Sequence, residues 1–231
     1  YIYFARLDSK IDNISVYEAR IRGGATLAKT YPVDADLVCG VPDSGLASAK
    51  GYSEESGIPF GLAFHKNSYV GRTFIKPTQK ERESSVKIKL SVLESVVKGK
   101  RIVLVDDSIV RGTTISNLIT MLRKAGATEV HVRISSPPFL YPCYFGTDIP
   151  DQKLLVATGR TVDQINEIIG ADTLGYLSTE HVVRLAQNAN GGFCTACFTG
   201  QYAVKPEEVL STDIHERHLN DRPKDEKKLG E

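Results

Sequence analysis

The sequence predicts an α/β fold in which a mostly parallel, twisted sheet is flanked by helices. Short β-branched apolar runs alternate with amphipathic stretches of helical period, and turn residues separate them. The order strand, turn, helix and strand over residues 101–134 is the βαβ arrangement. Because crossovers of this kind are right-handed and bring their strands side by side in the same direction, a parallel sheet follows.

The first predicted strand and helix come early in the chain. A short apolar run ends at Pro42, and Asp43 and Ser44 then offer an N-cap for a helix that reaches Gly57. A second apolar run, residues 60–64, follows.

The next stretch is less regular. Residues 66–82 are polar and basic, contain Gly71 and Pro77 and show no clear period, so we expect a long mobile loop. Residues 85–97 predict a helix that stops at Gly99. Its apolar residues recur at helical spacing: Val86, Leu90, Leu93 and Val97.

The middle of the chain contains the most regular pattern. A β-branched run over residues 101–105 predicts a strand, and residues 113–125 predict an amphipathic helix that stops at Gly126. The next strand is expected at residues 130–134. Two further helices are predicted at residues 162–169 and 178–187.

The composition is that of an ordinary globular protein. Hydrophobic residues make up 41% of the 231 residues, charged residues 25%, and the formal net charge is +1. A nucleic-acid binder is therefore not indicated. The apolar runs are too short to cross a bilayer and no leader opens the chain, so no membrane association and a cytoplasmic location are expected. We expect one domain over residues 1–204 and a polar, poorly ordered tail over residues 205–231.

The main chemical signal lies in residues 105–114. This run leaves the carboxyl end of a strand and leads into a helix N-terminus, whose free N–H groups and positive dipole end favour a phosphate. Thr113 and Thr114 add hydroxyl donors, and Asp106 and Asp107 can accept hydrogen bonds from two vicinal sugar hydroxyls. The run therefore predicts a ribose 5-phosphate site, with simple turn and cap residues as the alternative.

Four apolar residues, two acids, a spacer containing Arg111 and the residues Gly112-Thr113-Thr114 resemble the phosphoribosylpyrophosphate motif of type I phosphoribosyltransferases. Further segments are similar to one family, the glutamine phosphoribosylpyrophosphate amidotransferases: residues 40–45, 66–75 and 135–138. The resemblance runs from about residue 1 to residue 202 and implies the type I phosphoribosyltransferase fold. It covers only the phosphoribosyltransferase half of the proteins in this family, so the amino-terminal glutaminase domain is expected to be absent. The residues that begin at Tyr1 resemble the middle of a longer chain.

The resemblance implies a site for magnesium and phosphoribosylpyrophosphate. It places Ser44, Asp106 and Asp107 at the metal. Their hydroxyl and carboxylate groups supply the hard oxygen ligands that magnesium prefers. It assigns Lys66, Arg72 and the two aspartates to catalysis. The substrate-binding residues that it implies are Asp43, Ser44, Gly45, Lys66, Tyr69, Arg72, Lys76, Asp106, Asp107, Ser108, Ile109, Val110, Arg111, Gly112, Thr113 and Thr114.

Residues 66–89 resemble the family's flexible loop, which closes over the substrate. Lys66, Tyr69, Arg72 and Lys76 could then meet the pyrophosphate, and closure would keep water away from a cationic ribose. Taken alone, this basic segment would be a solvated surface loop.

The implied reaction is displacement of pyrophosphate by ammonia, which gives 5-phosphoribosylamine in the first step of purine synthesis. The ammonia comes from glutamine in the full enzymes, so this chain should depend on added ammonia. Inhibition by purine nucleotides and a homotetramer are also implied.

Two alternative functions stay open. One is a regulatory module that senses nucleotides or phosphoribosylpyrophosphate, which the basic loop argues against. The other is a base-salvage phosphoribosyltransferase, for which no base-recognition segment is visible.

The cysteines suggest a second site. Cys194 and Cys197 form Cys-x-x-Cys, and the resemblance matches them and Cys143 to three ligands of a [4Fe-4S] cluster that one branch of the family carries. The fourth ligand would precede Tyr1. Zinc binding and a redox pair are the alternatives, and Cys39 is interpreted as a small core residue.

Overall fold

The computed structural model describes residues 1–67, 90–145, 151–186, 189 and 191–204. Its centre is a four-stranded sheet in the order β3-β6-β7-β8, and all three neighbouring pairs are parallel. The strands are β3 (Leu37–Gly40), β6 (Arg101–Asp106), β7 (Glu129–Ile134) and β8 (Thr173–Tyr176). The predicted parallel α/β class is therefore confirmed.

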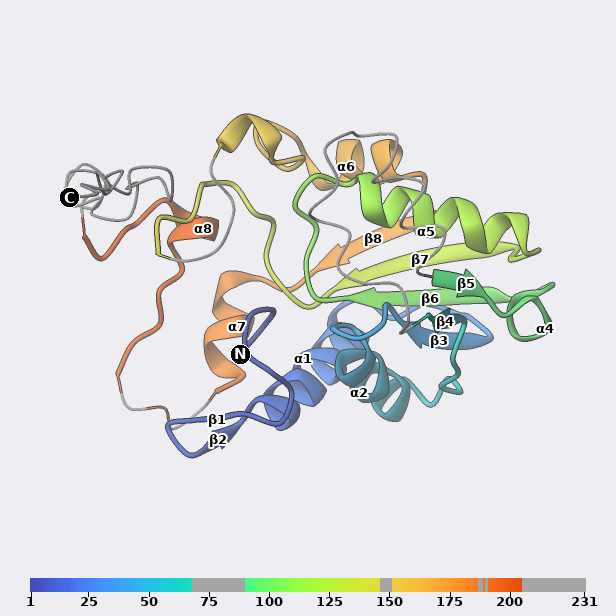
Figure 1. Ribbon diagram of the computed structural model, residues 1–231, viewed down its shortest axis with the longest axis horizontal. Coiled ribbons are helices and arrows are strands. Elements are labelled where there is room, and N and C mark those ends of the chain that lie inside the picture. Colours follow the sequence, from blue (N-terminus) through green and yellow to red (C-terminus); the bar gives the residue numbers. More distant parts are fainter. Residues whose placement is uncertain (68–89, 146–150, 187–188, 190, 205–231) are drawn as a thin grey trace, which may run out of the picture.

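Helices cover both faces of the sheet (Figure 1). The helices on one face are α1 (Val16–Thr30) and α2 (Leu46–Ser56), and those on the other are α5 (Thr113–Lys124) and α6 (Val162–Ile169). Because side chains alternate along a strand, β6 contributes to a separate buried cluster on each face. Ile102 and Leu104 pack with the α5 side, and Val103 and Val105 pack with the α1 and α2 side.

The smaller elements surround this sheet. They are β1 (Lys10–Ile11), β2 (Ile14–Ser15), β4 (Phe64–Lys66), β5 (Leu90–Val92), α4 (Glu94–Val97), the 3-10 turn η2 (Gln152–Leu154), α7 (Thr179–Arg184) and α8 (Ala196–Thr199). The helices α7 and α8 and the start of the chain lie beyond the carboxyl ends of the strands (Figure 1). No helix in the described ranges is long and apolar enough to span a membrane.

The sequence did not predict α1, the longest described helix. Its Ser15 N-cap accepts a hydrogen bond from the Glu18 N–H, and its buried residues recur three and four positions apart. At Gly24 the helix lies directly against α2, because a Cβ there would stand 1.8 Å from the carbonyl oxygen of Ser48. The small residues that make this contact also weaken the apolar period, which is why the helix was missed. Strand β8 was missed as well.

The predicted helix over residues 85–97 is wrong where the structure describes it. Leu90–Val92 form β5, which pairs antiparallel with β4, and only Glu94–Val97 are helical. Leu90 is buried against the core whereas Leu93 is exposed, so the apparent helical stripe does not lie on one face. Pairing with a strand distant in sequence overrides the local pattern.

The predicted cap of α2 also differs. The helix begins at Leu46 with Gly45 as its N-cap and no side-chain cap bond. Asp43 and Ser44 do not cap the helix, because their side chains bond to Lys66 and Asp106 instead. The predicted end is confirmed, since Gly57 takes the left-handed conformation that terminates a helix.

The remaining predicted elements are found close to their expected bounds: β3, β6, α5, β7, α6 and α7. The expected mobile loop lies outside the described residues after residue 67, and the expected tail, residues 205–231, lies outside them entirely.

Candidate functional site

The two predicted ligand turns meet at the carboxyl edge of the sheet. Strands β3 and β6 are neighbours, with Gly40 opposite Val105. The Val41 N–H donates to the Val105 carbonyl over 2.9 Å, and the Gly45 N–H donates back to the Val41 carbonyl over 2.9 Å. The turn after β3 is thereby folded against the end of β6, as expected for ligand sites of open α/β sheets.

Gly45 is needed for this contact. A Cβ at this position would lie 2.3 Å from the Val105 carbonyl oxygen and 3.1 Å from the Asp106 Cα. The backbone of one turn therefore touches the backbone of the other, and the peptide bond between Pro42 and Asp43, just before this contact, is cis. The result is that the Ser44 hydroxyl donates to Asp106 Oδ1 over 3.3 Å.

The aspartate pair lies at the centre of the site. Asp106 is only 8% exposed and also accepts the N–H of Asp107 over 2.8 Å, while Asp107 accepts the Ser108 hydroxyl over 2.6 Å. Burial, and then the charge of Asp107, raise the pKa of Asp106 well above its usual range. Burial also raises the pKa of Asp107, against the hydroxyls of Ser108 and Ser44 and the positive charge of Arg20. A bound cation would stabilise both ionised carboxylates.

Helix α5 begins directly after this pair. Its N-cap is Gly112, in the left-handed conformation with φ 81°, and no side chain caps the helix. The first N–H groups of α5, which have no acceptor within the helix, are therefore available to a ligand beside the exposed Thr113 and Thr114. This is the geometry that the sequence predicted for a phosphate.

The residues between Asp107 and Gly112 face different environments. The side chain of Ile109 is buried in the core, and Val110 packs against a second apolar cluster, so only their backbones could meet a ligand. Arg111 is exposed.

Lys66 joins the same end of the molecule. It is the last residue of β4, and its Nζ donates to the Asp43 carboxylate. The structure thus brings Lys66 to the turn that carries Ser44. The other loop residues expected in the site, Tyr69, Arg72 and Lys76, lie outside the described residues.

Sequence reasoning missed Arg20. This α1 residue is only 6% exposed, and its guanidinium donates to the Tyr1 carbonyl over 3.0 Å and to the Ala5 carbonyl over 2.9 Å. Its positive charge acts on Asp107, and burial lowers the pKa of the guanidinium. A signal existed, since Arg20 stands among Val16, Ala19 and Leu27 on the buried face of a helix.

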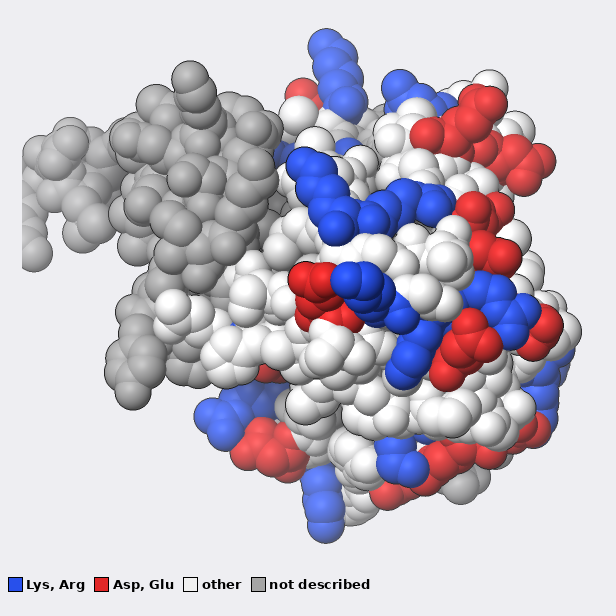
Figure 2. Space-filling model, turned by 90° about the vertical axis from the view of Figure 1, so that its right-hand side faces the viewer, with Lys and Arg blue, Asp and Glu red and all other residues white. Residues whose placement is uncertain are grey.

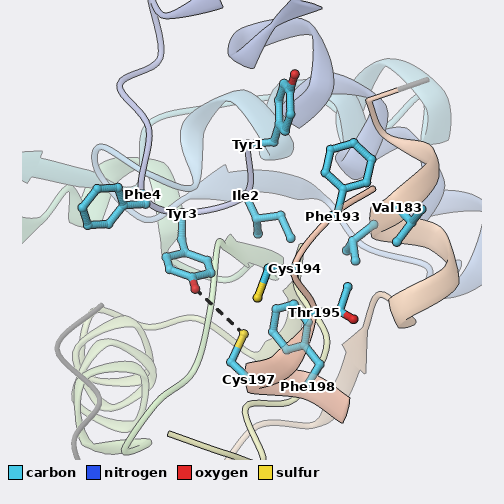
Figure 3. A pocket seen from close by; sticks show the side chains of 11 residues that line it. Tyr1, Ile2, Tyr3, Phe4, Val183, Phe193, Cys194, Thr195, Cys197 and Phe198 are labelled. Atoms are coloured by element: carbon cyan, nitrogen blue, oxygen red, sulfur yellow. Dashed lines mark hydrogen bonds between the residues drawn. The ribbon is translucent and has the colours of Figure 1, made fainter. Parts of the chain in front are cut away.

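Three cysteines gather beside α8. Cys197 is buried in a cluster with Phe139, and Cys143 packs against the same cluster. Figure 3 shows Cys194 and Cys197 in the lining of one pocket together with Tyr3, whose hydroxyl lies 4.0 Å from Cys197 Sγ. Burial raises the pKa of Cys197 to about 11. Within the described ranges, however, no group of three or more His, Cys, Asp or Glu residues is placed to hold a metal ion.

The predicted role of Cys39 as a core residue agrees with its position. It lies in β3 with 0% exposure, and burial raises the pKa of its thiol to about 12.

The fold and the site together define a class of protein. The family model for the phosphoribosyl transferase domain matches residues 12–135, more than half of the chain. The chain therefore belongs to this family, and the type I phosphoribosyltransferase fold is confirmed.

Individual relatives show which members of this family the chain is similar to. The chain is 54% identical to the amidophosphoribosyltransferase of Methanocaldococcus jannaschii over 92% of its length and 53% identical to that of Bacillus subtilis over 93%. The solved structure of glutamine phosphoribosylpyrophosphate amidotransferase from B. subtilis, complexed with ADP and GMP, matches 88% of the chain with a TM-score of 0.80 and 51% identity. The resemblance to this group is confirmed. The chain spans 45% of the length of both amidophosphoribosyltransferases and 46% of the solved chain.

Proposed function

We propose that the chain transfers the 5-phosphoribosyl group of phosphoribosylpyrophosphate to ammonia, which gives 5-phosphoribosylamine and pyrophosphate in the first step of purine synthesis. The observation that carries the proposal is the pair formed by the buried Asp106 and the half-buried Asp107, which follows the contact with Ser44 and precedes the uncapped start of α5. The names of the relatives support the choice of ammonia as acceptor.

Different residues of the site bind different groups of the substrate. Asp106 and Asp107 accept hydrogen bonds from the two ribose hydroxyls, and the N–H groups and hydroxyls of Thr113 and Thr114 hold the 5-phosphate. Ser44 contacts Asp106, and the same turn contacts Lys66 through Asp43, so the pyrophosphate would extend along this turn toward Lys66. Each group of the substrate thus meets a donor or acceptor of matching type.

Ser44, Asp106 and Asp107 fit a magnesium ion. They supply hard oxygen atoms, and the two carboxylates lie in a buried place where burial disfavours their charge. When bound, the ion would neutralise charge on the departing pyrophosphate.

The rate arises from positioning and charge, and no residue needs to form a covalent bond to the substrate. As the bond between ribose C1 and pyrophosphate breaks, positive charge develops on the ribose, and the carboxylates of Asp106 and Asp107 stabilise it. Lys66 would meet the negative pyrophosphate, and Arg72 and Lys76 are proposed to do the same from residues 66–89. Holding ammonia and ribose together contributes the rest.

The proposed partners follow from the relatives. Inhibition by purine nucleotides is supported by the B. subtilis amidotransferase that was solved with ADP and GMP. A homotetramer and a cytoplasmic location remain predictions from the sequence, as do the domain limits at residues 204 and 205. Sedimentation of the chain at several concentrations would test the tetramer.

Cys143, Cys194 and Cys197 do not by themselves fit a [4Fe-4S] cluster, since such clusters take four thiolates. We propose only that these three thiols are ligands of such a cluster, because they lie in one region and Cys143 and Cys194 both act electrostatically on Cys197. Iron content and visible absorption after anaerobic purification test this, and an iron-free, colourless protein would contradict it.

The proposed activity can be tested by pyrophosphate release. The chain is mixed with magnesium, phosphoribosylpyrophosphate and ammonium, and compared with the double variant Asp106→Asn plus Asp107→Asn. Removing both carboxylates should lower ammonia-dependent release at least about 100-fold. The matched control is Asp34→Asn plus Asp36→Asn, which removes two carboxylates near the other end of β6 and should leave release unchanged.

The same assay separates the alternatives. Tight substrate binding without ammonia-dependent release would favour a sensing module. Release that depends on a purine or pyrimidine base instead of ammonia would favour a salvage enzyme.

A further inference from the structure

A cavity lies between α1 and α7, and none of the residues of the candidate site lines it. It has a volume of about 320 Å³, and cationic side chains from both helices line it. These are Arg22 and Lys29 of α1 and Arg184 of α7, together with His181. No Asp or Glu is among the residues that line it.

Helical spacing explains why the cations meet. Arg22, Thr26 and Lys29 stand four and three positions apart, so they share one face of α1. His181 and Arg184 stand three positions apart on α7. The Arg22 Nε donates to the Leu185 carbonyl just after α7 over 2.8 Å, which holds the two helices together at the cavity.

The positive charge is only partly compensated. Lys29 pairs with Glu55 over 3.2 Å and Arg184 pairs with Glu180, but all four side chains are exposed, and such pairs exchange readily for another anion. Arg22 has no carboxylate partner among the described residues, and apart from its bond to Leu185 its guanidinium is available.

His181 adds a polar group at the wall. Its Nδ1 is buried without a hydrogen-bond partner in the described structure. One of the residues that line the cavity therefore has a buried nitrogen that lacks a hydrogen-bond partner in the described part of the chain.

We propose that this cavity binds a phosphate monoester. Two guanidinium groups and an ammonium around one hollow are the donors that recognise phosphate oxygens, and a concave wall of one charge concentrates an oppositely charged ligand. The volume exceeds what a bare phosphate ion needs and suits a small organic phosphate. The inference does not depend on the proposed transferase activity, since it shares no residue with that site.

Nuclear magnetic resonance of the imidazole groups can test the proposal. Glycerol 3-phosphate and inorganic phosphate are titrated separately into the full chain at constant ionic strength, and the His181 signals are identified with His181→Gln. The exposed His65, next to Lys66, reports phosphate binding at the other site. The His181 signals should move saturably, and at lower concentration with glycerol 3-phosphate than with inorganic phosphate.

Two variants decide the outcome. Arg22→Gln plus Arg184→Gln should weaken the His181 response about tenfold or more and leave the His65 response unchanged. The matched control, Lys98→Gln plus Lys124→Gln, removes the same charge elsewhere and should change neither. The proposal is overturned if His181 does not respond, if sodium sulfate and sodium chloride shift it equally, or if both double variants behave alike. It is also overturned if the His181 signals depend on protein concentration without any phosphate, because an acidic segment of a second copy would then occupy the cavity.

Discussion

Strand β6 has a pair of aspartates near each of its ends, and the two pairs behave in opposite ways. At the amino end, the Arg101 side chain donates to Asp34 over 2.6 Å and to Asp36 over 2.8 and 3.1 Å. Both carboxylates form ion pairs with Arg101, and Figure 2 shows cationic and acidic side chains alternating on one face of the molecule. At the carboxyl end, Asp106 is buried and Asp107 is half-buried, and their carboxylates accept hydrogen bonds from hydroxyl and N–H groups.

The surroundings determine the charge of each pair. Hydrogen bonds from the Arg101 side chain and backbone lower the pKa of Asp36 to about 2. Burial raises the pKa of Asp106. Asp36 stabilises the fold when ionised, whereas Asp106 and Asp107 carry charge that the fold disfavours and that a bound cation would stabilise. A functional site therefore weakens the end of the strand that carries it.

A large effect on both stability and transfer is expected from breaking the backbone contact at the carboxyl end. Gly45→Ala places a Cβ 2.3 Å from the Val105 carbonyl oxygen, so the Ser44 turn must move away from Asp106. We expect unfolding free energy to fall by about 1–3 kcal/mol, as for other overpacked sites, and ammonia-dependent pyrophosphate release to fall with it.

Gly57→Ala is the control for this change. Gly57 has a left-handed backbone but open space around its Cβ position, so the substitution should cost about 1 kcal/mol and leave transfer unchanged. Equal losses of transfer in both variants would contradict the role of the contact.

The two arginines provide the next test. Arg20→Met removes two buried charged hydrogen bonds and the cation that acts on Asp107, and should lower the unfolding free energy by about 1.5–3 kcal/mol and slow transfer. Arg101→Met removes bonds to exposed carboxylates and should change stability less and leave transfer unchanged. Urea unfolding measures the stability of the two variants, and pyrophosphate release measures their transfer. Unchanged transfer in Arg20→Met would show that Arg20 does not contribute to the site.

The smallest effects concern pH. For Asp36 the folded pKa lies below the unfolded value, so its stabilisation is present above about pH 4 and is lost as the pH falls toward 2. For Asp106 the folded pKa lies above the unfolded value, so stability decreases as the pH rises above about 4. Asp36→Asn should thus lower the melting temperature at pH 7, and Asp106→Asn should raise it. A change of melting temperature in the same direction for both variants would contradict the opposite roles of the two carboxylates.

Local sequence was enough to establish the parallel α/β class, the strand before Asp106 and the helix after Gly112. Periods of two and 3.6 residues and the chemistry of helix ends act over a few neighbouring residues, so they are visible in the chain. The motif over residues 105–114 also predicted a ribose 5-phosphate ligand, which agrees with the phosphoribosyl transferase family that the chain belongs to.

Other features depended on residues that are far apart in the chain. Leu90–Val92 became a strand because Phe64–Lys66 lie beside them, and the charge of Arg20 acts on Asp107 because α1 packs on the sheet. Whether an aspartate is ionised depends on its burial and on the cations around it, and only tertiary packing determines either. The aspartates near the two ends of β6 are therefore present in the sequence, while the opposite pKa shifts of Asp36 and Asp106 are decided by the fold.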